Sequence, residues 1–198
     1  MILGPLPAAR VWRIAPGSAI YQRMGNTNER IKTGVERSVK ALTLKPSLGH
    51  GTGHSTVTVK DGVTCEVVEG PWRFVVDMPT SVGGAGAGPT PGVYGRGALG
   101  SCLAIGYMMH AARLGMPVDS LVVDVEADYD DGAMFGTADD VPPGYTQVRY
   151  TVTVESRAPE ADIVRMLDEA DARSPYLDVF RRAQPCVRRV HVRAAVAR

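Results

Sequence analysis

Three cysteines are the side chains of this sequence best suited to nucleophilic or redox chemistry. Cys65 falls in an alternating, strand-like segment, and Cys186 follows a proline near the end of the chain, so we expect both to be free thiols without a chemical role. Cys102 differs because Gly100 and Ser101 precede it within a long apolar segment, which leaves little bulk near its sulfur. A thiol is a nucleophile only where its surroundings stabilise the thiolate, so packing and catalysis both remain open for Cys102.

The histidines and acidic residues do not suggest a metal centre. His50 and His54 flank a Gly-Thr-Gly turn, where exposed side chains are expected. His110 lies eight residues after Cys102, which on a helix is about 12 Å along the axis and too far for a direct dyad. The acidic residues between positions 124 and 140 lack the spacing of a calcium loop, and a solvated strand edge and loop is expected there. We therefore predict neither a metal nor an organic cofactor.

Composition narrows the function classes further. The chain has 198 residues, with 22 Lys and Arg against 21 Asp and Glu, and 44% hydrophobic residues, which is typical of a globular protein. A balanced charge argues against a broadly basic nucleic-acid binder. The longest uncharged apolar segment, residues 98–109, is shorter than the ~20 residues of a membrane span, and the N-terminus lacks a secretory pattern. We expect a protein of the reducing cytoplasm with no nucleic-acid or membrane partner.

Periodicity predicts the elements that must position Cys102. Residues 1–27 have no sustained period and predict an arm, and Asn28 is the expected N-cap of an amphipathic helix. The expected elements are a helix over 28–42, strands at 56–60, 63–68 and 72–78, a glycine-rich loop at 81–91, a helix at 92–114, strands at 121–129 and 148–155, a helix near 163–170, a helical turn at 175–180 and a last strand at 187–192. We expect residues 1–50 to form an N-terminal extension with one amphipathic helix, and residues 51–198 to form the main domain.

The order of elements indicates an α+β fold. Runs of strands lie on both sides of the helix at 92–114, which argues against a parallel doubly wound sheet. That helix is apolar nearly all round and is expected to be buried. Its five glycines lower helix stability by about 1 kcal/mol each relative to alanine, a cost that close approach of another backbone would offset.

One long segment resembles a known family. GGAGAGPTPGVYGRGALGSCLAIGYMMHAARLGMPVDSLVVDVEAD is similar to the OsmC/Ohr family of osmotically inducible and organic-hydroperoxide-resistance proteins. The shared features are the glycine-rich loop, the Pro-Thr-Pro helix start, the Ala-Leu-Gly-Ser-Cys core, the Gly-x-Pro exit into an acidic strand, and a later Ser-Pro-Tyr segment with a valine-rich strand. The resemblance covers about residues 55–193. It implies an α+β fold with antiparallel sheets around a buried central helix, and an intertwined homodimer.

The resemblance also implies a chemistry. Peroxidase members attack the O–O bond of an organic peroxide with a cysteine on the central helix, and a second cysteine resolves the sulfenate to a disulfide. Cys102 matches the attacking cysteine. Ser174 stands at the resolving position and cannot form a disulfide, while Gly92 and Val93 stand where peroxidase members have a glutamate. Lys60, beside the first hairpin turn, takes the place of an arginine; it keeps the charge that stabilises a thiolate but loses the bidentate fork.

The leading hypothesis is the reduction of organic hydroperoxides through Cys102, with an external thiol as reductant. Arg96, one and a half helical turns before Cys102, is a second candidate for stabilising the thiolate, although a surface or interface charge is the simpler interpretation. Cys186 is a weaker candidate for resolving the sulfenate, because it lies twelve residues beyond Ser174.

The alternative is a protein without catalytic activity that binds a small apolar ligand at the dimer interface. Cys102 would then serve packing only, and the ligand would be lined by Tyr94, Met108, Met109 and Phe180. The pH dependence of Cys102 alkylation separates the two hypotheses, since a midpoint well below ~8.5 favours chemistry.

Overall fold

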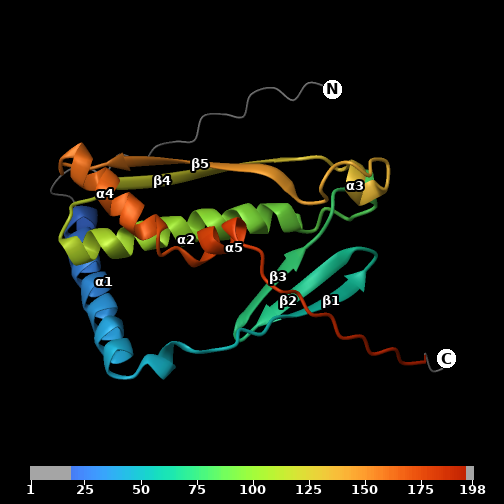
Figure 1. Cartoon of the computed structure of the whole chain (residues 1–198), viewed down its shortest axis with the longest axis horizontal. Helices are drawn as coiled ribbons and strands as arrows, with labels where there is room; N and C mark the ends of the chain where they lie inside the picture. Colours follow the sequence, from blue (N-terminus) through green and yellow to red (C-terminus); the bar gives the residue numbers. More distant parts are fainter. Residues whose placement is uncertain (1–18, 195–198) are drawn as a thin grey trace. The chain divides into compact units, whose positions relative to one another are not determined.

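The computed structural model describes residues 19–194, with side chains described for residues 27–194. Its residues divide into two units. The first unit comprises the chain up to Thr52 together with Met109–Pro117, and the second comprises Gly53–Met108 and the chain from Val118 onward. Helix α2, which carries Cys102, begins in the second unit and ends in the first. The elements are labelled in Figure 1.

Helix α1 spans Ala19–Leu44 and begins earlier than the sequence predicts. Asn28 lies inside this helix, so its predicted role as N-cap is wrong. Asparagine in a helix interior is less favourable than alanine by no more than about 0.7 kcal/mol, so one asparagine does not end a helix. The helix ends as predicted before Pro46, where the short 3-10 helix η1, Pro46–Gly49, follows. Residues 1–18, the larger part of the predicted arm, lie outside the described residues.

The predicted meander of three antiparallel strands is present. Strands β1 (Thr56–Asp61), β2 (Thr64–Glu69) and β3 (Trp72–Val76) pair in that order. Gly62 and Gly70 occupy the two turns with φ of 52° and 53°, in the left-handed region that favours glycine. The register of β1 and β2 shifts between Val59 and Asp61, which places Lys60 at a bulge.

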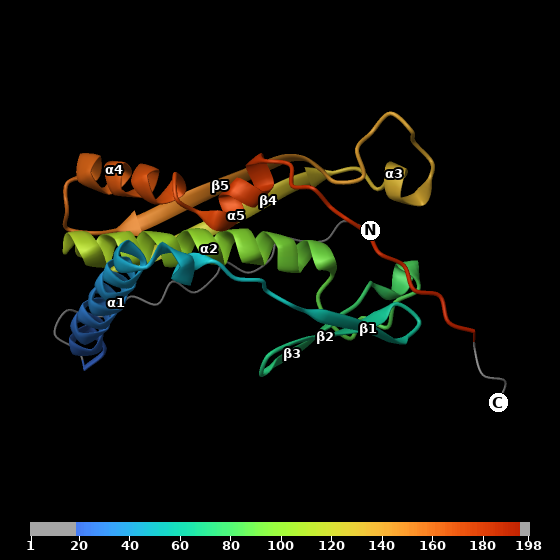
Figure 2. The same ribbon diagram turned by 60° about the horizontal axis from the view of Figure 1, so that its bottom comes forward.

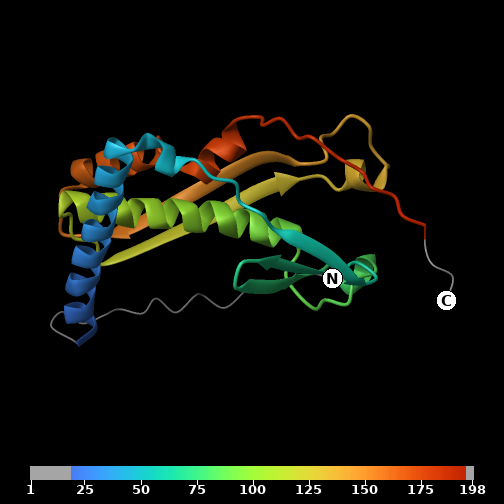
Figure 3. The same ribbon diagram turned by 90° about the horizontal axis from the view of Figure 1, so that it is seen from below.

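The sheet lacks the buried face that its alternation predicts. Val67 is buried, but Val59 and Trp72 are 63% and 72% exposed. The sheet lies near the start of α2 (Figure 3). Tyr94 of α2 contacts it, with its ring 5.0 Å from the Phe74 ring and its hydroxyl 2.8 Å from the Val75 carbonyl oxygen. One chain therefore covers little of this sheet, although the alternation of its side chains is that of a half-buried sheet.

A buried carboxylate organises the glycine-rich loop between β3 and α2. Asp77 is 1% exposed and accepts hydrogen bonds from the backbone N–H groups of Met78 (2.8 Å), Ala85 (3.1 Å) and Ala87 (2.9 Å). These bonds, that of Ala87 foremost, hold the pKa of Asp77 below its usual range. The loop also contains the 3-10 helix η2, Thr80–Val82. At Gly84 a Cβ atom would lie 1.8 Å from the Met78 carbonyl oxygen, so this path requires glycine.

A two-stranded ribbon runs alongside α2, Pro91–Leu114, in the second unit (Figures 1 and 2). Strands β4 (Ser120–Tyr129) and β5 (Tyr145–Glu155) are antiparallel, and the short helix α3, Gly132–Phe135, interrupts the acidic loop between them. A Cβ atom on Gly100 would lie 3.2 Å from Val125 Cγ2. The expected close approach at a glycine of this helix is thus made by the chain's own strand β4.

The core of the second unit lies where α2 meets two later helices. Helix α4 spans Glu160–Asp171 and α5 spans Pro175–Arg181. The most buried apolar side chains are Leu99, Leu103 and Tyr107 from α2, Met166 and Ala170 from α4, and Leu177 from α5. The arrangement confirms the predicted α+β class with antiparallel sheets.

Within one chain, helix α2 is buried on one side, and the predicted burial of its other side stays a prediction. Leu99 and Leu103 are at most 1% exposed, whereas Val93 and Ile105 on another side are 46% and 60% exposed. The apolar character of the sequence cannot show which side its own chain covers, and here β4, α4 and α5 cover one.

The predicted last strand at 187–192 is also wrong. Among the described residues this segment is extended but pairs with no strand, and Val187 and Val192 are 84% and 91% exposed. Alternation shows that a segment suits a sheet, but a strand also needs a neighbour with free backbone groups. No helix in the described part of the chain combines the length and apolarity needed to cross a bilayer.

Candidate functional site

The structure brings Cys102 and Ser174 together although they are 72 residues apart in sequence. Cys102 is half-buried on α2, and its Sγ atom lies 3.7 Å from Ser174 Oγ. Ser174 is buried, with 8% of its surface exposed. A nucleophilic sulfur and a hydroxyl therefore share one small environment beside the core.

Backbone contacts fix Ser174 at the N-terminus of α5. Its hydroxyl accepts a hydrogen bond from the Leu177 backbone N–H at 3.4 Å, which is the geometry of an N-cap. Its own N–H donates to the Asp171 carbonyl oxygen at 3.1 Å, and its carbonyl accepts from Asp178 N–H at 3.1 Å. Pro175 follows at the first helical position, where its fixed φ suits a helix start.

Two tyrosines hold the end of α4 next to this site. Tyr107 of α2 donates its hydroxyl to Asp171 Oδ1 at 2.6 Å, and Tyr150 of β5 donates to Asp171 Oδ2 at 2.5 Å. Short bonds of this kind to a carboxylate are stronger than neutral ones. Burial and the Asp171 carboxylate raise the pKa of Tyr107, and they raise the pKa of Tyr150 to about 12. Both hydroxyls thus stay protonated at neutral pH.

Sequence reasoning missed this cluster, here called the Asp171 brace and defined as Asp171, Tyr107 and Tyr150. The sequence did contain a signal for such a cluster. Tyr107 lies on a helix expected to be buried, and a buried tyrosine hydroxyl needs a polar partner. The sequence did not show which acidic residue would supply it.

Arg96 belongs to a second cluster at the start of α2. Its Nη1 atom donates to the hydroxyl of Tyr145 at 3.3 Å, and that hydroxyl donates to the Gly92 carbonyl at 3.2 Å. The Tyr145 ring stacks on Phe180 with centroids 6.3 Å apart. A Cβ atom on Gly92 would lie 3.3 Å from both Arg96 Nη1 and Tyr145 Oη. A side chain at this position would therefore adjoin the Arg96 guanidinium.

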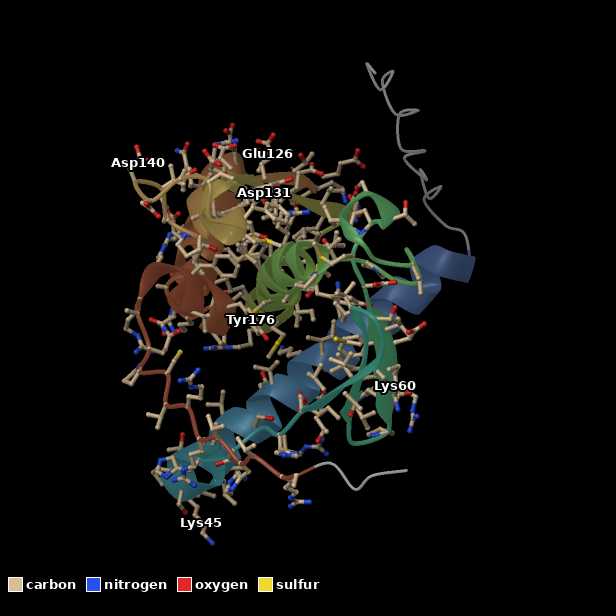
Figure 4. All side chains as sticks on the ribbon, turned by 90° about the vertical axis from the view of Figure 1, so that its right-hand side faces the viewer. Lys45, Lys60, Glu126, Asp131, Asp140 and Tyr176 are labelled. Atoms are coloured by element: carbon tan, nitrogen blue, oxygen red, sulfur yellow. The ribbon has the colours of Figure 1, made fainter. Side chains whose placement is uncertain are left out.

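Lys60 is paired with Glu66 on the hairpin. Its Nζ atom lies 3.0 Å from Glu66 Oε2, and its side chain is 53% exposed on the three-stranded sheet (Figure 4). Lys60 and Arg73 hold the pKa of Glu66 below its usual range. Within the described part of one chain, Lys60 is brought to Glu66 and not to Cys102, so its role as a thiolate stabiliser stays a prediction.

The other two cysteines lie in different settings. Cys65 is half-buried in β2, with its sulfur 3.6 Å from the Val63 carbonyl oxygen. Cys186 is exposed, with its sulfur 3.7 Å from the Gln184 carbonyl oxygen. The described sulfur contact of each cysteine is thus with a carbonyl two residues earlier in the chain.

No set of three or more His, Cys, Asp or Glu side chains among the described residues is arranged to hold a metal ion. His50, His54 and His191 are exposed. The acidic residues Glu126, Asp131 and Asp140 lie on the same side of the second unit, as Figure 4 shows.

The four residues predicted to line a ligand site fall into different surroundings. Tyr94 packs on Phe74, and its hydroxyl donates to the Val75 carbonyl at 2.8 Å. Phe180 stacks on Tyr145. Met108 is half-buried and Met109 is 39% exposed. Their part in ligand binding stays a prediction.

The fold and site define an α+β protein in which antiparallel strands and the helices α4 and α5 cover one side of a long helix that bears a half-buried cysteine. A family model described as OsmC-like protein matches residues 83–187, just over half of the 198-residue chain. The chain belongs to this family. The matched range contains both Cys102 and Ser174.

Solved structures of the family share the fold. An OsmC-like protein from Mycoplasma pneumoniae has a TM-score of 0.57 at 14% identity, over 66% of this chain and 88% of that one. An OsmC-like protein of unknown function from Vibrio cholerae gives 0.54 at 14% identity, over 66% and 94%. An organic hydroperoxide resistance protein OsmC from Legionella pneumophila gives 0.51 at 14% identity, over 66% and 90%. At this identity the likeness establishes the fold. None of the curated proteins matches this chain.

Proposed function

We propose that this protein reduces organic hydroperoxides through Cys102. The observation that carries the proposal is the 3.7 Å contact between Cys102 Sγ and Ser174 Oγ, because it joins the two positions at which family peroxidases carry their reacting cysteines. Cys102 is also half-buried, so its own chain does not enclose the residue fully. The organic hydroperoxide resistance protein among the solved structures supports the choice of substrate class.

The first step is a two-electron oxidation of the sulfur. The Cys102 thiolate attacks one oxygen of the peroxide R–O–O–H, an S–O bond forms, and the O–O bond breaks. The sulfur becomes a sulfenic acid, and the leaving alkoxide takes a proton to become the alcohol R–OH.

The second step returns the sulfur to its thiol form. Ser174 has no sulfur, so the resolving role passes to a small thiol from solution. One thiol molecule condenses with the sulfenic acid, releasing water and forming a mixed disulfide. A second thiol molecule attacks that disulfide, restores Cys102 and leaves as the oxidised disulfide of the reductant.

We further propose that two copies form the working unit. The stripe of α2 side chains spaced by four, Val93, Gly97, Ser101 and Ile105, is exposed in one chain. It combines apolar and small residues, which allow two helices to approach closely. The poorly covered sheet β1–β3 supplies a second apolar surface for the same purpose.

Stopped-flow mixing with cumene hydroperoxide and t-butyl hydroperoxide tests the proposal. The full chain, first reduced, should consume one equivalent of peroxide without added thiol and many equivalents when a thiol is present. Cys102→Ser should lose this consumption, whereas the matched variants Cys65→Ser and Cys186→Ser should keep it. Consumption at the parent rate by Cys102→Ser would end the proposal.

Ligand binding without catalysis remains the second candidate. The replacement of a glutamate by Gly92 and of a resolving cysteine by Ser174 favours it, because both changes remove groups that peroxidase relatives use. Native mass spectrometry of the purified protein should then show a retained apolar molecule, and the parent chain should consume no peroxide.

A further inference from the structure

We propose that Ser174 donates a hydrogen bond to the Cys102 thiolate, and that the Asp171 brace holds Ser174 in place to do so. The inference rests on the proposed function only in taking Cys102 as the reacting group. It assigns Ser174 a positive role, whereas its place in the family pattern suggests only a lost disulfide.

Either group can donate in this contact, so the protonation state of Cys102 decides its direction. A serine hydroxyl has one proton to donate and two lone pairs that accept. Ser174 Oγ already accepts from the Leu177 N–H at 3.4 Å, which leaves its proton available toward Cys102 Sγ at 3.7 Å. A thiolate has no proton, so in that state Ser174 must be the donor. A hydrogen bond to an ionised acceptor is stronger than one to a neutral thiol, so the contact favours the thiolate.

The Asp171 brace sets the position of this donor. Asp171 ends α4, and its carbonyl accepts from the Ser174 N–H at 3.1 Å. Its carboxylate accepts from Tyr107, which lies on the same helix as Cys102. The segment 171–174 therefore contacts α2 at two points, one at Tyr107 and one at Cys102. Tyr150 adds a third element, β5, to the same carboxylate.

The brace stays intact over the pH range in which a thiol ionises, near ~8.5. The pKa of Tyr150 is raised to about 12 and that of Tyr107 is raised as well, so both hydroxyls remain donors there. The other charged groups that act on these tyrosines are Arg181 of α5 and Asp168 of α4.

The test measures the rate of Cys102 alkylation by iodoacetamide against pH, in the full chain with Cys65→Ser and Cys186→Ser. We expect Ser174→Ala to move the midpoint upward by about 1 pH unit, a tenfold change in the thiolate equilibrium. Ser174→Thr keeps the hydroxyl and should restore the parent midpoint. Ser38→Ala is the matched control, because Ser38 is exposed on α1 and its hydroxyl donates to the Gly34 carbonyl at 3.0 Å.

Variants of the Asp171 brace provide a second, independent test of the inference. Tyr107→Phe and Asp171→Asn leave Ser174 unchanged, and each should move the midpoint upward by part of the Ser174→Ala shift. These variants also test the inference if loss of the α5 N-cap prevents Ser174→Ala from folding.

The outcomes separate this inference from the proposed function. A midpoint unchanged in folded Ser174→Ala, or equal shifts in Ser174→Ala and Ser174→Thr, would overturn the inference even if the protein consumes peroxide. A shifted midpoint in a protein that consumes no peroxide would support the inference and overturn the proposed function.

Discussion

A hydroxyl in place of a thiol beside Cys102 changes which reactions the chain can complete. Ser174 cannot form a disulfide, but it donates a proton that a thiol donates only weakly. Gly92 lies in a different cluster, where a Cβ atom would lie 3.3 Å from Arg96 Nη1 and Tyr145 Oη. The described polar partner of the sulfur is thus the Ser174 hydroxyl.

A second prediction about a single residue concerns Asp77. Its folded pKa is lowered, so the carboxylate stabilises the fold above its unfolded pKa of ~3.9, and this contribution is lost as pH falls through the folded value. Asp77→Asn should be less stable than the parent in urea at pH 7, because an amide has one oxygen for three backbone N–H donors. From pH 7 to pH 3 the variant should lose less stability than the parent.

The control for this experiment is Asp140→Asn, which changes an exposed aspartate in the acidic loop. It should follow the parent at both pH values. The account of the loop fails if Asp77→Asn and the parent lose the same stability on acidification.

Helix α2 is the element that positions Cys102. Its buried side places Leu99 and Leu103 against the core, and this packing fixes the rotation of the helix about its axis. Cys102 lies next to that buried side and therefore faces the start of α5. Strand β4 approaches closely at Gly100, whereas a Cβ atom on Gly97 or Gly106 would meet nothing within 4 Å.

Leu103→Ala tests this packing. Leu103 is 1% exposed, and removal of a leucine side chain from a core costs about 2–5 kcal/mol in free energy of unfolding. The control Ser101→Ala, two residues away on the exposed side, should stay within about 0.5 kcal/mol. Urea unfolding followed by circular dichroism measures both, and equal stability of the two variants would show that α2 is packed differently.

The whole molecule exposes more apolar surface than one chain can cover. Ile105 and Trp72 are 60% and 72% exposed, and they lie on α2 and on the three-stranded sheet. A second copy of the chain has the same exposed surfaces, and a symmetric dimer would bury these surfaces on both copies. The proposed homodimer thus accounts for the alternation of β1–β3 and for the apolar character of α2 on its uncovered side.

Ile105→Glu should therefore convert dimer to monomer. A carboxylate placed on the exposed stripe of α2 would be buried without a partner if two copies met there, which costs several kcal/mol. Light scattering coupled to gel filtration should give about twice the chain mass for the parent and the single-chain mass for the variant. Val164→Glu, at a 48% exposed position of α4, should leave the mass of the parent unchanged. A monomeric parent would contradict the dimer.

The sequence by itself determined the α+β class, the meander, the long helix and the special place of Cys102, because periodicity and glycine spacing are local properties of the chain. It also marked Ser174 and Gly92 as departures from the family pattern. Only the tertiary structure decided that Asn28 lies inside a helix, that residues 187–192 pair with none of the described strands, and that Asp171 joins Tyr107 to Tyr150. Each of these features depends on which distant segments of the chain pack together. That packing, and not the local sequence pattern, sets burial and hydrogen-bond partners.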